Sequence, residues 1–115
     1  SKENFLNVFI SQLSSSWVRY FIKYDPDPYI SNIQASVLVL NGDKDIQVVS
    51  RTNLPAMEAS LKKSHARSYE IKELKGLNHL FQHCTLCTVQ EYGTLEETFS
   101  PDALKIMWEW LNKVL

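Results

Sequence analysis

The chain has 115 residues, of which 44% are hydrophobic and 22% are charged, and its formal net charge is −1. This composition fits one small globular domain, and the near-neutral charge gives no reason to expect nucleic acid or an anionic membrane surface as a partner. No apolar run is long enough to cross a bilayer, so no membrane partner is expected. The sequence starts at Ser1 without an initiator Met or a signal peptide. We therefore expect either processing or a longer parent protein, and the compartment stays open.

Two helices are predicted in residues 1–26, which we interpret as a helical lead-in. The first has apolar residues at helical spacing, namely Phe5, Phe9 and Leu13. A serine of residues 14–16 can cap the second helix, and Pro26 ends it because proline disfavours the helical conformation in the preceding residue. The second helix carries an aromatic stripe, Trp17, Tyr20, Phe21 and Tyr24. We expect this stripe to lie in the core rather than to line a substrate pocket.

A buried strand is predicted in residues 37–40, whose sequence Val-Leu-Val-Leu runs directly into a polar turn, residues 41–45. A short strand that is apolar on both faces is typical of parallel sheets. The turn carries the carboxylates of Asp43 and Asp45. In open α/β sheets, the carboxyl end of a strand is where ligands bind, so this turn is the first candidate for a functional site.

A helix and a second strand are predicted after this turn. Ser50 or Asn53 can cap the helix, and Pro55 is expected in its first turn, where its missing N–H has no helical partner. The expected apolar face of the helix consists of Leu54, Met57 and Leu61. Residues 69–74 alternate between apolar and polar side chains, which is typical of a half-exposed edge strand.

A long loop with one or two helical turns is expected in residues 80–98, and Ser100-Pro101 marks the start of the last helix. We expect Glu109 to pair with Lys113 on this helix. Its predicted apolar stripe is Leu104, Met107, Trp108, Leu111 and Leu115.

The fold class predicted from these elements is α/β, with two parallel strands, flanking helices and a right-handed crossover in residues 27–115. A parallel sheet of two strands leaves the apolar strand 37–40 with a free edge. We therefore expect this unit to be the end of a larger sheet.

Asp45 and His79 are the candidate catalytic residues. They lie 34 positions apart, but each follows the carboxyl end of a predicted strand. If the strands are parallel neighbours, both side chains lie at the same edge of the sheet. A carboxylate beside an imidazole orients the ring and stabilises the charge that the ring gains with a proton. The structural alternatives are that Asp45 only shapes a turn and that His79 is an ordinary loop residue.

The segments 37–48 and 74–79 resemble the C-terminal part of the α/β-hydrolase fold, in bacterial hydrolases of the serine-aminopeptidase-like and ester-cleaving branches. The resemblance implies that Asp45 is the acid and His79 the base of a catalytic triad, with Asp43 shaping the turn. The sequence Gly-x-Ser-x-Gly, which carries the nucleophile in this family, occurs nowhere in the chain. The implied function is the C-terminal portion of a serine hydrolase that cleaves an ester or amide substrate, is inactive alone and uses no cofactor.

Two other functions are open. The free edge of strand 37–40 can pair with a second copy, which predicts a non-catalytic, self-associating domain. His79, His83, Cys84 and Cys87 have the residue types of a zinc site, which makes a small zinc module the weaker alternative. Four zinc ligands from one tight segment are unusual, so we expect no metal, and we expect the cysteines to be free and packed as small apolar side chains.

Overall fold

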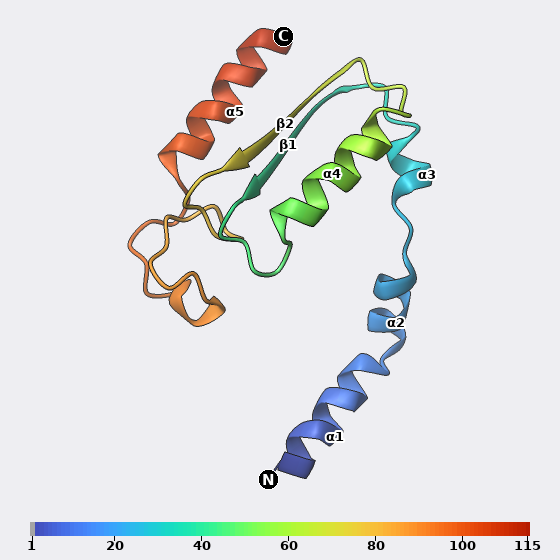
Figure 1. Cartoon of the computed structure of the whole chain (residues 1–115), viewed down its shortest axis with the longest axis vertical. Coiled ribbons are helices and arrows are strands. Elements are labelled where there is room, and N and C mark those ends of the chain that lie inside the picture. Colours follow the sequence, from blue (N-terminus) through green and yellow to red (C-terminus); the bar gives the residue numbers. More distant parts are fainter. Residues whose placement is uncertain (1) are drawn as a thin grey trace.

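The computed structural model describes residues 2–115 and shows a mixed α/β fold with a two-stranded parallel sheet, as predicted (Figure 1). The elements are α1 (Lys2–Leu13), α2 (Ser16–Lys23), α3 (Asp27–Ile30), β1 (Ser36–Gly42), α4 (Ser50–Leu61), β2 (Ser68–Leu74), the 3-10 turn η1 (Val89–Glu91) and α5 (Pro101–Val114). The predicted order of helices and strands is confirmed. No helix in the described part of the chain is long and apolar enough to span a membrane.

The sheet brings the carboxyl ends of its two strands to the same edge. β1 and β2 are parallel and in register from the pair Ser36 and Ser68 to the pair Gly42 and Leu74. In the described residues β1 has one partner strand, so its second edge is open. The expectation that this strand is buried on both faces is only partly correct: Val39 is buried, but its apolar neighbours are half-buried.

Each face of the sheet packs against one helix. On the α4 side the core is formed by Ile30, Val39 and Leu61, and the predicted apolar face of α4 is confirmed because Leu54 and Met57 pack against them. On the α5 side the core is formed by Leu74, Leu77 and Ala103, with Phe81 and Ile106 among the side chains around it. Complete burial of one such large apolar side chain stabilises a fold by about 1.5–3 kcal/mol. These two small cores fix both strands and the turns that follow them.

The start of α4 differs from the prediction because its expected capping side chains have other partners. Val49 occupies the cap position, and no side chain caps the helix. The hydroxyl of Ser50 donates to the carboxylate of Glu73 at 2.5 Å, and the amide of Asn53 donates to Asn41. The helix therefore begins at Ser50, and Pro55 lies inside it rather than in its first turn.

The face of α5 that packs on the sheet is shifted from the predicted stripe. Ala103 is completely buried, whereas Leu104 and Trp108 are 54% and 65% exposed. The small side chain of Ala103 lets the helix approach Leu74 and Leu77 closely. The predicted pair of Glu109 and Lys113 is also wrong. Lys113 binds Glu70 on β2, and Glu109 lies near Lys105.

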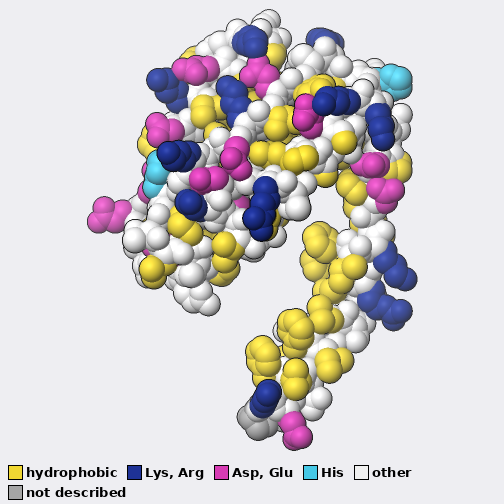
Figure 2. Space-filling view, in the orientation of Figure 1, with side chains coloured by type: hydrophobic (Ala, Val, Ile, Leu, Met, Phe, Trp, Pro, Cys, Tyr) yellow, Lys and Arg dark blue, Asp and Glu magenta, His cyan; other side chains and the backbone are white. Residues whose placement is uncertain are grey.

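Helices α1 and α2 form an arm that projects from the rest of the molecule (Figure 1). Neither helix has a buried residue, and hydrophobic side chains line the arm in Figure 2. The aromatic stripe of α2 is thus not in the core: Trp17 and Phe21 stack on each other at 5.4 Å, and both are about two-thirds exposed. The radius of gyration is 17.4 Å, against roughly 13 Å for a compact chain of this length. The predicted lead-in begins with Ser1, which lies outside the described residues.

Gly42 lets the turn after β2 cross the end of β1. The backbone N–H groups of Asp43 and Lys44 donate to the carbonyl groups of Leu74 and Leu77, both at 3.0 Å. A Cβ atom on Gly42 would lie 2.0 Å from the carbonyl oxygen of Leu77, which is backbone and buried. The close approach therefore requires glycine at this position.

Replacing Gly42 by Ala should destabilise the fold by about 3 kcal/mol, the upper end of the cost of overpacking, because two backbone segments must separate. Gly93→Ala is the matched control, since a Cβ there meets no atom within 4 Å. Denaturant unfolding of both variants measures the difference. Equal midpoints for the two variants would show that the crossing is not tight.

Candidate functional site

Asp45 lies in the loop directly after β1, with one carboxylate oxygen held by the backbone. Its Oδ1 accepts hydrogen bonds from the N–H groups of Gln47 at 2.9 Å and Val48 at 2.8 Å. The side chain is only 6% exposed. Because Oδ1 is fixed by the loop itself, the second oxygen, Oδ2, points in a defined direction.

His79 meets this second oxygen. Its Nδ1 lies 2.9 Å from Asp45 Oδ2, so the structure brings together the two residues that the sequence predicted as partners. The imidazole is 37% exposed, far more than the carboxylate. Within residues 2–115, no protein group is hydrogen-bonded to Nε2. A ring with Nδ1–H bound to a carboxylate has Nε2 available as a proton acceptor.

The pKa of Asp45 is lower than that of an ordinary aspartate. Burial of the carboxylate raises the pKa, but the hydrogen bonds from Val48, His79 and Gln47 together lower it by more. The carboxylate is therefore ionised at neutral pH. An ionised Asp45 favours the tautomer of His79 with a proton on Nδ1.

Asn41 supports the loop that carries Asp45, and the sequence reasoning missed it. Its side chain is buried and donates to the carbonyl oxygen of Val48 at 3.0 Å, with a longer contact of 3.4 Å to Asp45 Oδ2. The carbonyl oxygen of the same side chain accepts a hydrogen bond from Asn53 on α4 at 2.8 Å. A polar residue at the end of an otherwise apolar strand was the signal for this role.

Asp43 holds the turn that leads to His79, in keeping with the structural role expected for it. Its Oδ1 accepts a hydrogen bond from the N–H of Gly76 at 2.6 Å. Gly76 has a φ of 81°, a conformation that glycine adopts without steric cost. Asp43 therefore ties the turn after β2 to the end of β1, and Asp45 binds the residue that this turn presents.

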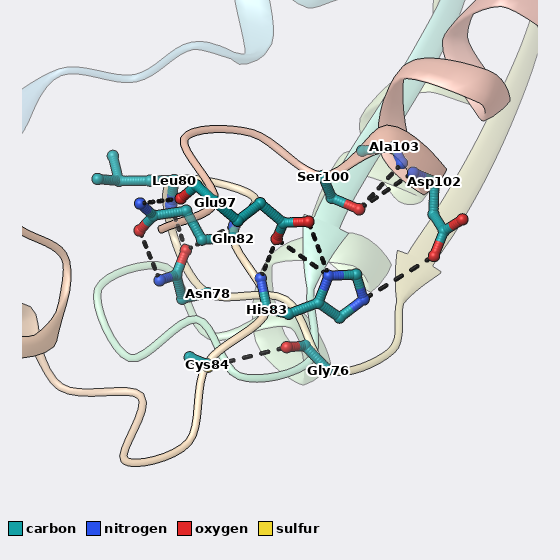
Figure 3. Close-up of polar contacts among 10 residues, drawn as sticks. All are labelled: Gly76, Asn78, Leu80, Gln82, His83, Cys84, Glu97, Ser100, Asp102 and Ala103. Atoms are coloured by element: carbon teal, nitrogen blue, oxygen red, sulfur yellow. Dashed lines mark hydrogen bonds and ion pairs between the residues drawn. The ribbon is translucent and has the colours of Figure 1, made fainter. Parts of the chain in front are cut away.

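The buried amide side chains of Asn78 and Gln82 fix the backbone before and after His79 in the chain, and Figure 3 shows their contacts. Asn78 Oδ1 accepts hydrogen bonds from the N–H groups of Leu80 and Gln82, and Asn78 Nδ2 donates to Gln82 Oε1 at 3.0 Å. Gln82 in turn donates to the carbonyl oxygen of Glu97 at 2.8 Å. Both residues are more than 95% buried. Sequence reasoning missed this pair, because its partners lie in the loop of weak periodicity.

The four residues of the alternative zinc cluster do not form a common group of ligand atoms. Cys84 and Cys87 form a disulfide, so the expectation of free cysteines is wrong. His79 is bound to Asp45, and His83 lies 3.0 Å from the carboxylate of Glu97 (Figure 3). Neither histidine belongs to a three-residue metal-ligating group in the described part of the chain. The two cysteines close onto each other because the backbone turns between them, with Cys87 at a φ of 56°.

A small pocket of about 210 Å³ lies beside the Asp45–His79 pair. It is lined by Leu40, Asn41, Asp45, Val48, Asn53, His79 and Phe81. Pockets for small molecules usually measure about 300–1,000 Å³, so this one can hold only part of a substrate. The residues around it supply a proton acceptor and its orienting carboxylate. No Ser, Thr or Cys side chain lines it.

Comparisons with protein-family models, with curated proteins and with solved structures found no match.

The lowered pKa of Asp45 predicts an acid-sensitive contribution to stability. Because the pKa is lower in the folded state, the contribution is complete above the unfolded value of about 3.9 and is lost as the pH falls through the folded value. Below about pH 4, the free energy of unfolding of the unchanged protein should therefore fall more steeply than that of the Asp45→Asn variant. Denaturant unfolding at several pH values measures both slopes. Glu96→Gln, at an exposed position, is the control and should show the same steep fall in the free energy of unfolding as the unchanged protein. If the free energies of the unchanged protein and of Asp45→Asn fall in parallel below pH 4, Asp45 does not make this contribution.

Proposed function

We propose that this chain is the C-terminal portion of a serine hydrolase of the α/β-hydrolase fold, carrying the acid and the base of the catalytic triad. One observation carries the proposal: Asp45 Oδ2 lies 2.9 Å from His79 Nδ1 while two backbone N–H groups hold Oδ1. The chain order of acid before histidine, each after a parallel strand, agrees with this fold. The serine nucleophile would come from residues outside this chain.

In the proposed reaction, the serine hydroxyl attacks the carbonyl carbon of an ester or amide while His79 Nε2 takes its proton. The resulting imidazolium is stabilised by the Asp45 carboxylate at Nδ1. His79 then gives the proton to the leaving alcohol or amine, which leaves an acyl-enzyme. Water, activated by the same nitrogen, hydrolyses this intermediate. No step requires a metal or an organic cofactor.

The surface around β1 supports a larger assembly. One edge of β1 is open in the described chain, and an apolar groove of about 290 Å³ runs beside it between β1 and α5. Its lining consists of Leu38, Leu40, Met107, Trp110 and Leu111. Further strands of a hydrolase sheet would pair with this edge and cover the groove. They would also bring their own carboxyl ends, and hence a nucleophile, to the side where His79 lies.

His79→Ala should abolish hydrolysis of a short aryl ester by the longer protein that contains this chain, and Asp45→Asn should lower kcat by about 10⁴-fold because the tautomer of His79 is no longer fixed. Steady-state kinetics with a chromogenic ester measures both variants. His65→Ala is the matched control, since His65 is an exposed histidine after α4. Unchanged turnover in His79→Ala would refute the proposed function, and the 115-residue chain alone should show no turnover.

The second candidate function is a non-catalytic domain that self-associates, and the open edge of β1 favours it. Two copies can pair these edges around a two-fold axis and cover the apolar grooves at the same time. Sedimentation equilibrium should then show a monomer–dimer equilibrium that Leu38→Glu shifts to the monomer. Leu86→Glu is the control, since Leu86 is already 74% exposed and lies in another loop. A monomer at every concentration would exclude this candidate.

A further inference from the structure

The Cys84–Cys87 disulfide closes a very short loop on the surface. The two cysteines are three positions apart, and Leu86 between them is 74% exposed. A cross-link stabilises a fold more when it closes a longer loop, so this one contributes little by that route. The chain has no other cysteines with which these two could have paired. A role in stability alone therefore does not explain why two thiols lie here.

The carboxylate of Glu91 is held against this loop by the backbone. It accepts hydrogen bonds from the N–H groups of Thr85 at 3.1 Å, Leu86 at 3.0 Å and Cys87 at 2.6 Å. One of its oxygens and the two sulfur atoms all lie within 4.8 Å of one another. In the described residues 2–115, this is the one group of His, Cys, Asp and Glu side chains that converges in this way.

We propose that residues 84–91 form a redox-gated binding site for a thiophilic divalent cation such as Zn²⁺, with Cys84 Sγ, Cys87 Sγ and the Glu91 carboxylate as its protein ligands. In the oxidised state the disulfide blocks the site. A dithiol reductant breaks the S–S bond by giving two electrons and two protons to the sulfur atoms, and is itself oxidised to a disulfide. The cation then replaces the two thiol protons, which pass to solvent.

The local geometry suits this cation. Zinc prefers tetrahedral sites with sulfur ligands at about 2.3 Å, which places neighbouring ligand atoms roughly 3.5–3.8 Å apart. The three candidate atoms already lie within 4.8 Å of one another, and breaking the S–S bond lets the two sulfur atoms separate to this spacing. Three protein ligands leave the fourth position of the tetrahedron to water, since the loop is at the surface.

This ligand set differs from the His79, His83, Cys84 and Cys87 cluster considered from the sequence. Both histidines keep their carboxylate partners, and Glu91 takes their place beside the sulfur atoms. The site therefore does not use the Asp45–His79 pair, and it does not depend on the proposed hydrolase function.

Titration of the reduced chain with Cd²⁺ tests the proposal, because thiolate-to-cadmium charge transfer absorbs in the ultraviolet. The protein is first reduced with dithiothreitol, and the reductant is then removed under anaerobic conditions. Cd²⁺ is titrated into the reduced protein, and Zn²⁺ is added afterwards as a competitor. We expect one equivalent to bind to the reduced protein and none to the oxidised protein. Cys84→Ser or Cys87→Ser should weaken binding by about 100-fold, and Glu91→Gln by about 10-fold.

Two further variants separate a ligand from a residue that only shapes the loop. Glu96→Gln, at an exposed neighbouring carboxylate, should bind as the unchanged protein does. Glu91→His removes the acceptor of the three N–H groups but supplies a zinc ligand, so it should bind more tightly than Glu91→Gln. Equally weak binding by both Glu91 variants would overturn the proposal. The proposal is also overturned if the reduced protein binds Cd²⁺ no more tightly than a variant with both Cys84→Ser and Cys87→Ser.

Discussion

The crossing of two backbone segments at Gly42 is the constraint on which the site depends. The turn after β2 passes so close to the end of β1 that the space of a single methyl group is filled by the carbonyl oxygen of Leu77. Hydrogen bonds from Asp43 and Lys44 hold the segments at this distance. Because Asp45 and His79 each lie only two or three residues from the crossing, their separation is set by backbone contacts rather than by flexible side chains.

Buried polar side chains complete this arrangement on both sides. Asn41 and Asn53 connect the loop of Asp45 to α4, whereas Asn78 and Gln82 connect the turn of His79 to the loop before α5. Each buried amide has partners, and no buried side-chain nitrogen or oxygen of the described residues is left without one. An unpaired buried polar group costs about 1–3 kcal/mol, so these networks allow few alternative positions for the loops. The contact between Asp45 and His79 is thereby held in place by the fold itself.

The sequence was most informative where a local pattern determines the structure. Three features follow from apolar runs, caps and the geometry of parallel strands: the strand 37–40, a capping serine both within residues 14–16 and at Ser100, and the pairing of Asp45 with His79. Side chains with distant partners were misjudged: Ser50 binds Glu73 instead of capping α4, and Lys113 binds Glu70 instead of Glu109. The same limit applies to α5, because which of two adjacent apolar faces packs on the sheet depends on how closely Ala103 can approach it. Such contacts depend on tertiary packing, which periodicity does not encode.

The exposed apolar surface has two parts, which lie differently with respect to the Asp45–His79 pair. The exposed apolar side chains of α1 and α2 line no part of the pocket beside this pair, whereas the apolar groove between β1 and α5 shares Leu40 with that pocket. In the proposed hydrolase, the missing part of the protein would cover these surfaces. A segment that covered them would stabilise the fold through burial without changing the contact between Asp45 and His79. The same segment could deliver a nucleophile to Nε2 of His79, because that nitrogen has no hydrogen-bond partner in residues 2–115 and its ring is partly open to solvent. The proposed hydrolase would thus be built from a preformed acid–base pair and a separately supplied serine.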